Sequence, residues 1–168
     1  MSRPEDNKLY NRLGLFRKMF FQLSIEEEQF KLWFKENVGT RTNLWGLSNH
    51  NKKFHGLRTG SRFTMHKPSG MKSLNNFSIA HGKYKKDNEG LQVDIIAFIP
   101  IHIFLFFYST VLLISLIFVF SSLGQPIPWP IFVGFFSFIV FFLFWVYWNL
   151  KKSINGLVRA LEKEFSKV

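Results

Sequence analysis

Cysteine is absent from the 168 residues of this chain. Without thiols the chain cannot form a disulfide-stapled secreted module, a cysteine-ligated zinc site or a thiol-based active site. A second absence is regional, because residues 95–150 contain no Asp, Glu, Lys or Arg. Charged residues make up about a quarter of an ordinary soluble domain. A run of 56 residues without any charge therefore excludes a freely soluble enzyme.

Acidic residues are scarce in the rest of the chain, where 11 Asp and Glu stand against 22 Lys and Arg. The excess positive charge is split, with a net +8 in residues 1–94 and a net +3 in residues 151–168. Between these basic parts lie 13 of the 22 Phe residues. This distribution predicts an α+β membrane protein whose basic parts lie on either side of an apolar insertion.

The uncharged stretch is predicted to be a transmembrane hairpin, residues 99–149. Two apolar runs, at about residues 100–121 and 129–149, are each long enough to cross a hydrocarbon core about 30 Å thick. The segment between them, 121–130, contains three Pro and one Gly and cannot continue a helix.

The charges on either side of the hairpin predict its orientation. Basic residues lie shortly before the first run and after the second, whereas the connecting loop is uncharged. These flanking residues are Lys83, Lys85, Lys86, Lys151, Lys152 and Arg159. Because positive flanks stay in the cytoplasm, we expect both termini to be cytoplasmic and the hairpin to lie in a cytoplasmic (inner) membrane. Trp129, Trp145 and Trp148 lie where aromatic residues meet lipid headgroups.

Residues 1–23 have the pattern of a basic amphipathic segment. Large apolar residues recur at spacings of three and four, which is typical of one face of a helix. The residues of this face are Leu9, Leu13, Phe16 and Phe20. Such a helix either lies in the membrane interface or packs on the chain's own domain, and the sequence leaves both alternatives open.

Residues 24–98 are predicted to form a small cytoplasmic α+β domain. Ser24 and Glu27 are spaced as a capping box for a helix that ends near Val38. Beyond Thr40 the apolar period changes to two, which predicts an antiparallel sheet of four or five strands. The predicted strands are 42–48, 52–57, 62–66, 75–84 and 90–98. Because the last strand leads directly into the first apolar run, we expect the sheet to lie against the membrane surface.

Residues 150–168 are predicted to form a C-terminal amphipathic helix. Its apolar face consists of Ile154, Leu157, Leu161 and Phe165. A face this narrow favours packing on the protein's own domain over docking on a partner.

The basic domain contains several titratable residues, but their pattern does not predict a site of chemistry. His50, His55, His66 and His81 lack metal-ligand spacing, and no nucleophile motif is present. We therefore predict no metal and no cofactor. A lipid-modifying enzyme would need a polar cluster built from His55, His66, His81 or Asp94. His102 lies in the first turn of the first apolar run, which favours a headgroup contact over a proton or ligand role.

Basic residues alternate with aromatic residues in this domain, a composition that also occurs in nucleic-acid-binding proteins. On a membrane-tethered domain the same residues more simply face anionic lipid headgroups. We therefore expect a lipid partner and no nucleic acid.

The sheet region resembles a known group of proteins. The residues that carry the resemblance are Phe54-His55-Gly56, Phe63, Asn75-Asn76-Phe77, Gly82-Lys83-Tyr84 and Gly90-Leu91-Gln92-Val93. They resemble small uncharacterised bacterial two-span membrane proteins with a cytoplasmic β domain, over about residues 26–168. The group has Arg-Asn-Ser-Phe where this chain has Leu74-Asn75-Asn76-Phe77. The resemblance implies the same layout and a bacterial origin, and it supplies no catalytic residues.

These features predict a non-enzymatic accessory or scaffold subunit. Such a subunit would place its basic domain against the membrane surface or beside a larger membrane complex, with anionic lipids, other subunits or further copies of itself as partners. The alternative is a small membrane effector that oligomerises through its spans into a pore.

Overall fold

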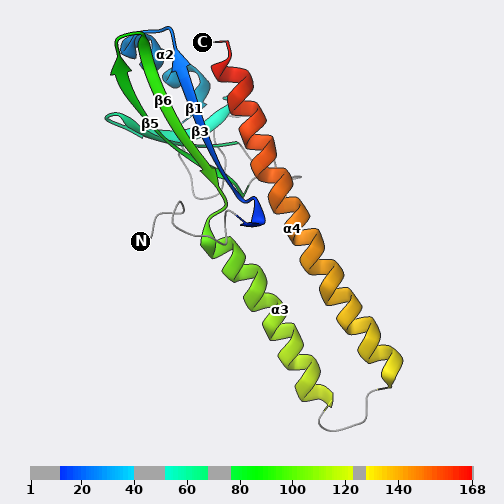
Figure 1. The fold of residues 1–168 in the computed structure, drawn as a ribbon. Helices are drawn as coiled ribbons and strands as arrows, with labels where there is room; N and C mark the ends of the chain where they lie inside the picture. The colour runs from blue at the N-terminus through cyan, green and yellow to red at the C-terminus, as the bar shows by residue number, and fades with distance from the viewer. Residues whose placement is uncertain (1–11, 40–51, 68–76, 123–127, 168) are drawn as a thin grey trace. The chain divides into compact units, whose positions relative to one another are not determined.

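The structure is a computed structural model that describes residues 12–39, 52–67, 77–122 and 128–167 (Figure 1). Its elements are, in chain order, β1 (Phe16–Leu23), α2 (Glu27–Asn37), β2 (Val38–Gly39), β3 (Phe54–Thr59), β4 (Arg62–His66), β5 (Ile79–Asp87), β6 (Gly90–Phe98), α3 (Ile101–Ser122) and α4 (Trp129–Phe165). The chain divides into two units, of which the second is Pro100–Asn149 and the first is the remainder. The predicted α+β class is confirmed.

The first unit is built on a six-stranded mixed sheet in the order β1-β6-β5-β4-β3-β2. Neighbouring strands are antiparallel except β2 and β3, which are parallel. The prediction of a purely antiparallel sheet of four or five strands is therefore wrong. The parallel pair was missed because β2 has only two residues, too few to show a period.

The largest correction concerns the amino-terminal segment, where a helix was predicted through Phe16 and Phe20. Residues Phe16–Leu23 instead form β1, which pairs with β6 over eight residues. The apolar residues of this segment satisfy both periods, since Leu15, Met19 and Leu23 are buried at a strand-compatible spacing. Pairing with the long apolar strand β6 favours the strand over the helix. Leu9 lies outside the described residues, and Leu13 lies just before the strand.

Two predicted strands, β4 and β6, have their predicted bounds. Gly60, in the turn before β4, and Gly90, the first residue of β6, have positive φ angles of 59° and 127°, which suit glycine. The predicted strand 42–48 lies outside the described residues. Strands β3 and β5 begin two and four residues later than predicted.

Helix α2 begins later than predicted. The N-cap is Glu26 and not Ser24, because Gln29 Oε1 accepts a hydrogen bond from the Glu26 N–H at 3.1 Å. Glu27 and Glu28 lie in the first turn, where carboxylates complement the positive helix end.

The core of the first unit lies between one face of the sheet and two helical segments. The ring of Phe30 from α2 packs on Phe63 and Tyr84 of the sheet, with centroids 5.9 and 5.0 Å apart. Phe165 from α4 stacks on Phe21 of β1 at 4.9 Å, and Figure 1 shows the end of α4 beside β1. The predicted apolar face of the C-terminal helix is therefore buried on the chain's own domain: Ile154, Leu157, Leu161 and Phe165 are at most 3% exposed.

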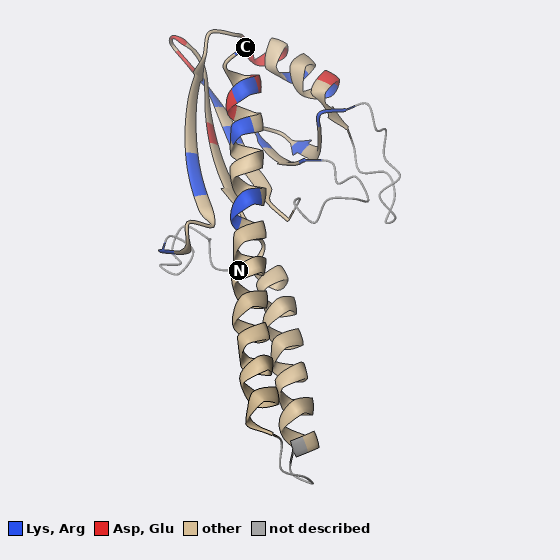
Figure 2. Cartoon of the chain, turned by 90° about the vertical axis from the view of Figure 1, so that its right-hand side faces the viewer, with Lys and Arg blue, Asp and Glu red and all other residues tan. Residues whose placement is uncertain are grey.

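The second unit contains α3 and the first part of α4. Aromatic side chains join the two helices, with Phe118 stacked on Phe135 at 3.8 Å and Phe107 near Phe142 at 6.4 Å. Both helices are long and apolar enough to cross a membrane by length and composition. Figure 2 shows no charged residue on α3 or on the first part of α4.

Candidate functional site

The basic residues predicted to flank the hairpin are placed on different elements of the first unit. Lys83 and Lys85 alternate along β5 with buried Gly82 and Tyr84 and are exposed, so they project from the sheet face opposite the core. Lys86 is exposed near the end of this strand. Three further residues are exposed on α4, on the side of the sheet that the helices cover: Lys151, Lys152 and Arg159. The structure therefore separates the predicted basic residues into two groups.

The sheet face around Lys83 gathers residues that the sequence analysis did not group. Arg62 of β4 and Asp94 of β6 lie on either side of Lys83 in the strand register. Phe20 of β1 lies next to Asp94 in the same row. One row further along the sheet, Lys18, Ile96, His81, Thr64 and Leu57 follow one another from β1 to β3. The period-two pattern of each strand could have shown its outward residues, but the register was needed to align them.

This face is uncovered by the described helices of the first unit, since α2 and the C-terminal part of α4 both pack on the core face. Its large apolar side chains are partly in solvent, with Phe20 57% and Leu57 61% exposed. Four basic side chains lie on the same face: Lys18, Arg62, Lys83 and Lys85. We call this surface, defined by these six residues, the uncovered face.

Carboxylates are distributed unevenly around the sheet. Asp94 is the acidic residue in the middle rows of the uncovered face, where it forms an ion pair with Lys83 at 3.4 Å. Two others, Asp87 and Glu89, lie at the tip of the β5–β6 hairpin. The remaining carboxylates of the described residues belong to the helices and the α2 N-cap: Glu26, Glu27, Glu28, Glu36, Glu162 and Glu164. Among the described residues, the uncovered face therefore has four basic side chains and one carboxylate in its middle rows.

His81 lies on the uncovered face, with its ring edge-on to Phe98 at a centroid distance of 5.0 Å. Partial removal of the ring from water lowers the pKa of His81 below 6.5. A shallow hollow of about 180 Å³ beside it is lined by residues that include Leu57, Arg62 and Thr64.

His55 and His66 face each other across β3 and β4, with ring centroids 5.8 Å apart. Asp94, the carboxylate considered for a polar cluster, is instead paired with Lys83. Among the described residues, no three His, Asp or Glu side chains lie close enough together to hold a metal ion. His50 lies outside the described residues.

The three Trp residues of α4 lie at positions suited to two membrane interfaces. Trp129 is 73% exposed and Trp148 is 59% exposed. They are separated by about 28 Å along a helix that rises 1.5 Å per residue. Trp145 lies one turn before Trp148 and is 40% exposed. This separation matches the thickness of a hydrocarbon core, about 30 Å.

Four hydroxyls of α3 donate hydrogen bonds to carbonyls of their own helix. Ser109 and Thr110 both donate to the Phe106 carbonyl, at 2.9 and 2.8 Å. Ser115 and Ser121 donate to carbonyls one turn earlier, each at 2.8 Å. Because each of these hydroxyls already has an acceptor, they can lie in an apolar environment without an unsatisfied hydrogen-bond donor. His102 is exposed in the first turn of α3.

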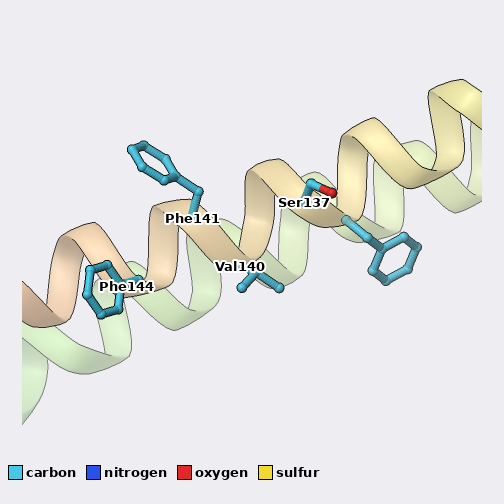
Figure 3. Close-up of a pocket in the computed structure, with 5 residues that line it drawn as sticks. Ser137, Val140, Phe141 and Phe144 are labelled. Atoms are coloured by element: carbon cyan, nitrogen blue, oxygen red, sulfur yellow. The ribbon is translucent and has the colours of Figure 1, made fainter.

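A hollow of about 570 Å³ lies on the outer side of α4 (Figure 3). Its lining is apolar apart from Ser137 and comprises Phe136, Val140, Phe141 and Phe144. All five residues are exposed. Such a surface suits contact with hydrocarbon and offers no set of polar groups for a small polar ligand.

Comparison with known proteins adds nothing to this geometry: no family model, no curated protein and no solved structure matches the chain.

Proposed function

We propose that this chain is a non-enzymatic accessory or scaffold subunit of a bacterial inner membrane. In this proposal α3 and the first part of α4 cross the bilayer as a hairpin, and the first unit is cytoplasmic. The observation that carries the proposal is the complete separation of charge. Every charged residue lies outside Pro100–Asn149, and that unit contains α3 and the apolar first part of α4.

The orientation is supported by the charges that border the hairpin. Lys151 and Lys152 follow Trp148 within one turn of α4. Basic residues near a span are retained in the cytoplasm. The chain enters α3 from the same unit, so both ends of the hairpin return to one side.

Two features of the described residues support a scaffold role: the hydrogen bonds of the hydroxyls in the spans and the basic side chains exposed on the domain. Four hydroxyls of α3 bond carbonyls of their own helix, those of Ser109, Thr110, Ser115 and Ser121. The spans carry no charged side chain of the kind that a transporter or channel would need at mid-depth. The domain exposes basic side chains on both sides of its sheet, and each contributes about 1 kcal/mol near an anionic membrane surface. Such a domain suits a protein that holds a position on the membrane beside a larger complex.

The proposal is tested by purifying the full chain in mild detergent and measuring the mass of the protein in the detergent complex. We expect a stoichiometric partner or a homo-oligomer. A monodisperse lone monomer would contradict the scaffold role. The orientation is tested with single cysteines, which the cysteine-free chain permits. Gln125→Cys should react with an impermeant maleimide in intact cells, whereas Lys163→Cys should react only after the inner membrane is opened.

A further inference from the structure

We propose that the uncovered face (Lys18, Phe20, Leu57, Arg62, Lys83 and Lys85) docks on the headgroups of a bilayer that contains anionic lipid. This inference rests on the proposed function, because it requires that the hairpin crosses a membrane. It adds which surface of the domain meets the lipid and which side chains make the contact.

The first step is charge complementarity. Lys18, Arg62, Lys83 and Lys85 come from three different strands, and the register brings them to one face. Asp94, which lies among them, is balanced by Lys83 at 3.4 Å. Lys18, Arg62 and Lys85 form no ion pair with another described residue, so the described part of the face presents their charge to an external anion. A membrane surface rich in anionic lipid presents many such anions in one plane, which matches a sheet better than a pocket would.

The second observation is that large apolar side chains are exposed on the same face. Phe20 and Leu57 are 57% and 61% exposed, and they lie on strands at different positions across the sheet. Apolar side chains that lie between basic ones fit the boundary between headgroups and acyl chains. The apolar side chains can enter the acyl-chain region while the basic groups stay at the phosphates.

The third step is the covalent tether. Strand β6 ends at Phe98 and helix α3 begins at Ile101, so only Ile99 and Pro100 separate them. Three residue steps of chain span at most about 10 Å. The end of β6 therefore stays within about 10 Å of the first residue of the span, and α4 supplies a second connection at Asn149–Leu150.

The tether favours a bilayer over a soluble acidic macromolecule. A domain that is held beside a membrane meets its headgroups at a high effective concentration, so that weak individual contacts suffice. A nucleic acid or an acidic protein would have to bind from solution, and the hollow beside His81 on the described part of the face is shallow, at about 180 Å³.

The experiment uses the full chain in proteoliposomes, with one environment-sensitive fluorophore on a single introduced cysteine. Leu57→Cys places the label on the uncovered face. Leu32→Cys is a matched control, since Leu32 is 60% exposed and lies on α2, on the opposite side of the sheet. Vesicles are made of phosphatidylcholine with or without phosphatidylglycerol. Acrylamide is the quencher because it is neutral and does not respond to the charge of the protein.

With phosphatidylglycerol and at low salt, we expect the label at position 57 to be several-fold less accessible to acrylamide than the label at position 32. High salt should remove the difference, because screening weakens contacts between charges at the surface. Replacing Lys18 and Lys85 by Gln should weaken docking by roughly 25-fold, at about five-fold per charge. The matched pair Lys35→Gln and Lys163→Gln, on the helix side, should leave docking unchanged.

Several results would overturn the inference while leaving the proposed function intact. These are equal accessibility of both labels, protection that is the same without phosphatidylglycerol, and protection that appears only after RNA or soluble protein is added. The proposed function fails separately if alkaline carbonate extracts the chain from the vesicles, because the hairpin is then not inserted.

Discussion

Ser78, just before β5, and Ser153, on α4, form a buried pair joined by hydrogen bonds. The Ser78 hydroxyl donates to the Ser153 carbonyl at 3.1 Å, and the Ser153 hydroxyl oxygen accepts from the Ser78 N–H at 3.2 Å. The same oxygen also lies 3.0 Å from the Phe77 nitrogen, whose N–H it accepts. The pair thus connects two segments separated in sequence by the whole apolar hairpin, and both residues belong to the first unit.

Replacing Ser153 by Ala should lower the free energy of unfolding of the first unit by about 1–3 kcal/mol. The change removes the oxygen that accepts from the buried Ser78 N–H and from the part-buried Phe77 N–H. Thermal unfolding in detergent, followed by the fluorescence of a label on the sheet, measures the loss. Ser166→Ala removes an exposed hydroxyl from the same helix region and should cost much less. Equal effects of the two changes would contradict a role for the pair.

Two glycines should respond to alanine with opposite signs. A Cβ at Gly82 would lie 2.0 Å from the ring of Phe63, which is buried and packed against Phe30, so Gly82→Ala should destabilise by about 1–3 kcal/mol. A Cβ at Gly156 meets nothing within 4 Å. Because Gly156 lies within α4, Gly156→Ala should stabilise by about 0.5–1 kcal/mol. The unfolding temperatures of both variants, measured in the same detergent, test the two opposite signs.

The ion pair between Lys53 and Glu164 should make stability depend on pH. Lys53 Nζ lies 2.6 Å from Glu164 Oε2 and holds the pKa of that carboxyl below its usual 4.5. A lowered pKa in the folded state stabilises at pH values above the unfolded pKa, and this contribution is lost as the pH falls through the folded value.

Glu164→Gln should therefore lower stability at neutral pH by about 0.2–1 kcal/mol, since Lys53 is half exposed. The difference from the unchanged chain should vanish as the pH falls below 4.5. Unfolding temperatures measured across this range test the sign. Glu162→Gln removes one carboxylate from the adjacent exposed face and should show no comparable change.

The hairpin should depend on Phe118 more than on Phe120. Phe118 stacks face to face on Phe135 at 3.8 Å, whereas Phe120 is 68% exposed. Aromatic pairs of this kind contribute about 0.5–1.5 kcal/mol beyond their buried area. Phe118→Ala should therefore open the hairpin, seen as slower migration of the chain in SDS gels, while Phe120→Ala should migrate as the unchanged chain does.

A liposome leakage assay distinguishes the scaffold from the pore-forming effector. We expect no release of an encapsulated dye from vesicles that contain the full chain, because residues 95–150 carry no charge and four hydroxyls of α3 are bonded within their own helix. Dye release that rises steeply with the protein-to-lipid ratio would favour the effector. A known pore-forming peptide in the same vesicles serves as the positive control.

The sequence by itself was sufficient for features that depend on local composition and period. The two apolar helices, the strands β4 and β6, and the buried face of Ile154, Leu157, Leu161 and Phe165 were all predicted from such patterns. Each of these segments supports only one regular structure, because its apolar residues recur at one spacing or run without interruption.

Only the tertiary structure decided the state of Phe16–Leu23, whose apolar residues fit both a helix and a strand. The long apolar strand β6 supplied the hydrogen-bonding partner that made the strand the better solution. The same pairing brought Lys18 and Phe20 beside residues more than forty positions away and so created the uncovered face. Register between distant strands depends on the packing of the whole sheet, which no local pattern in the chain contains.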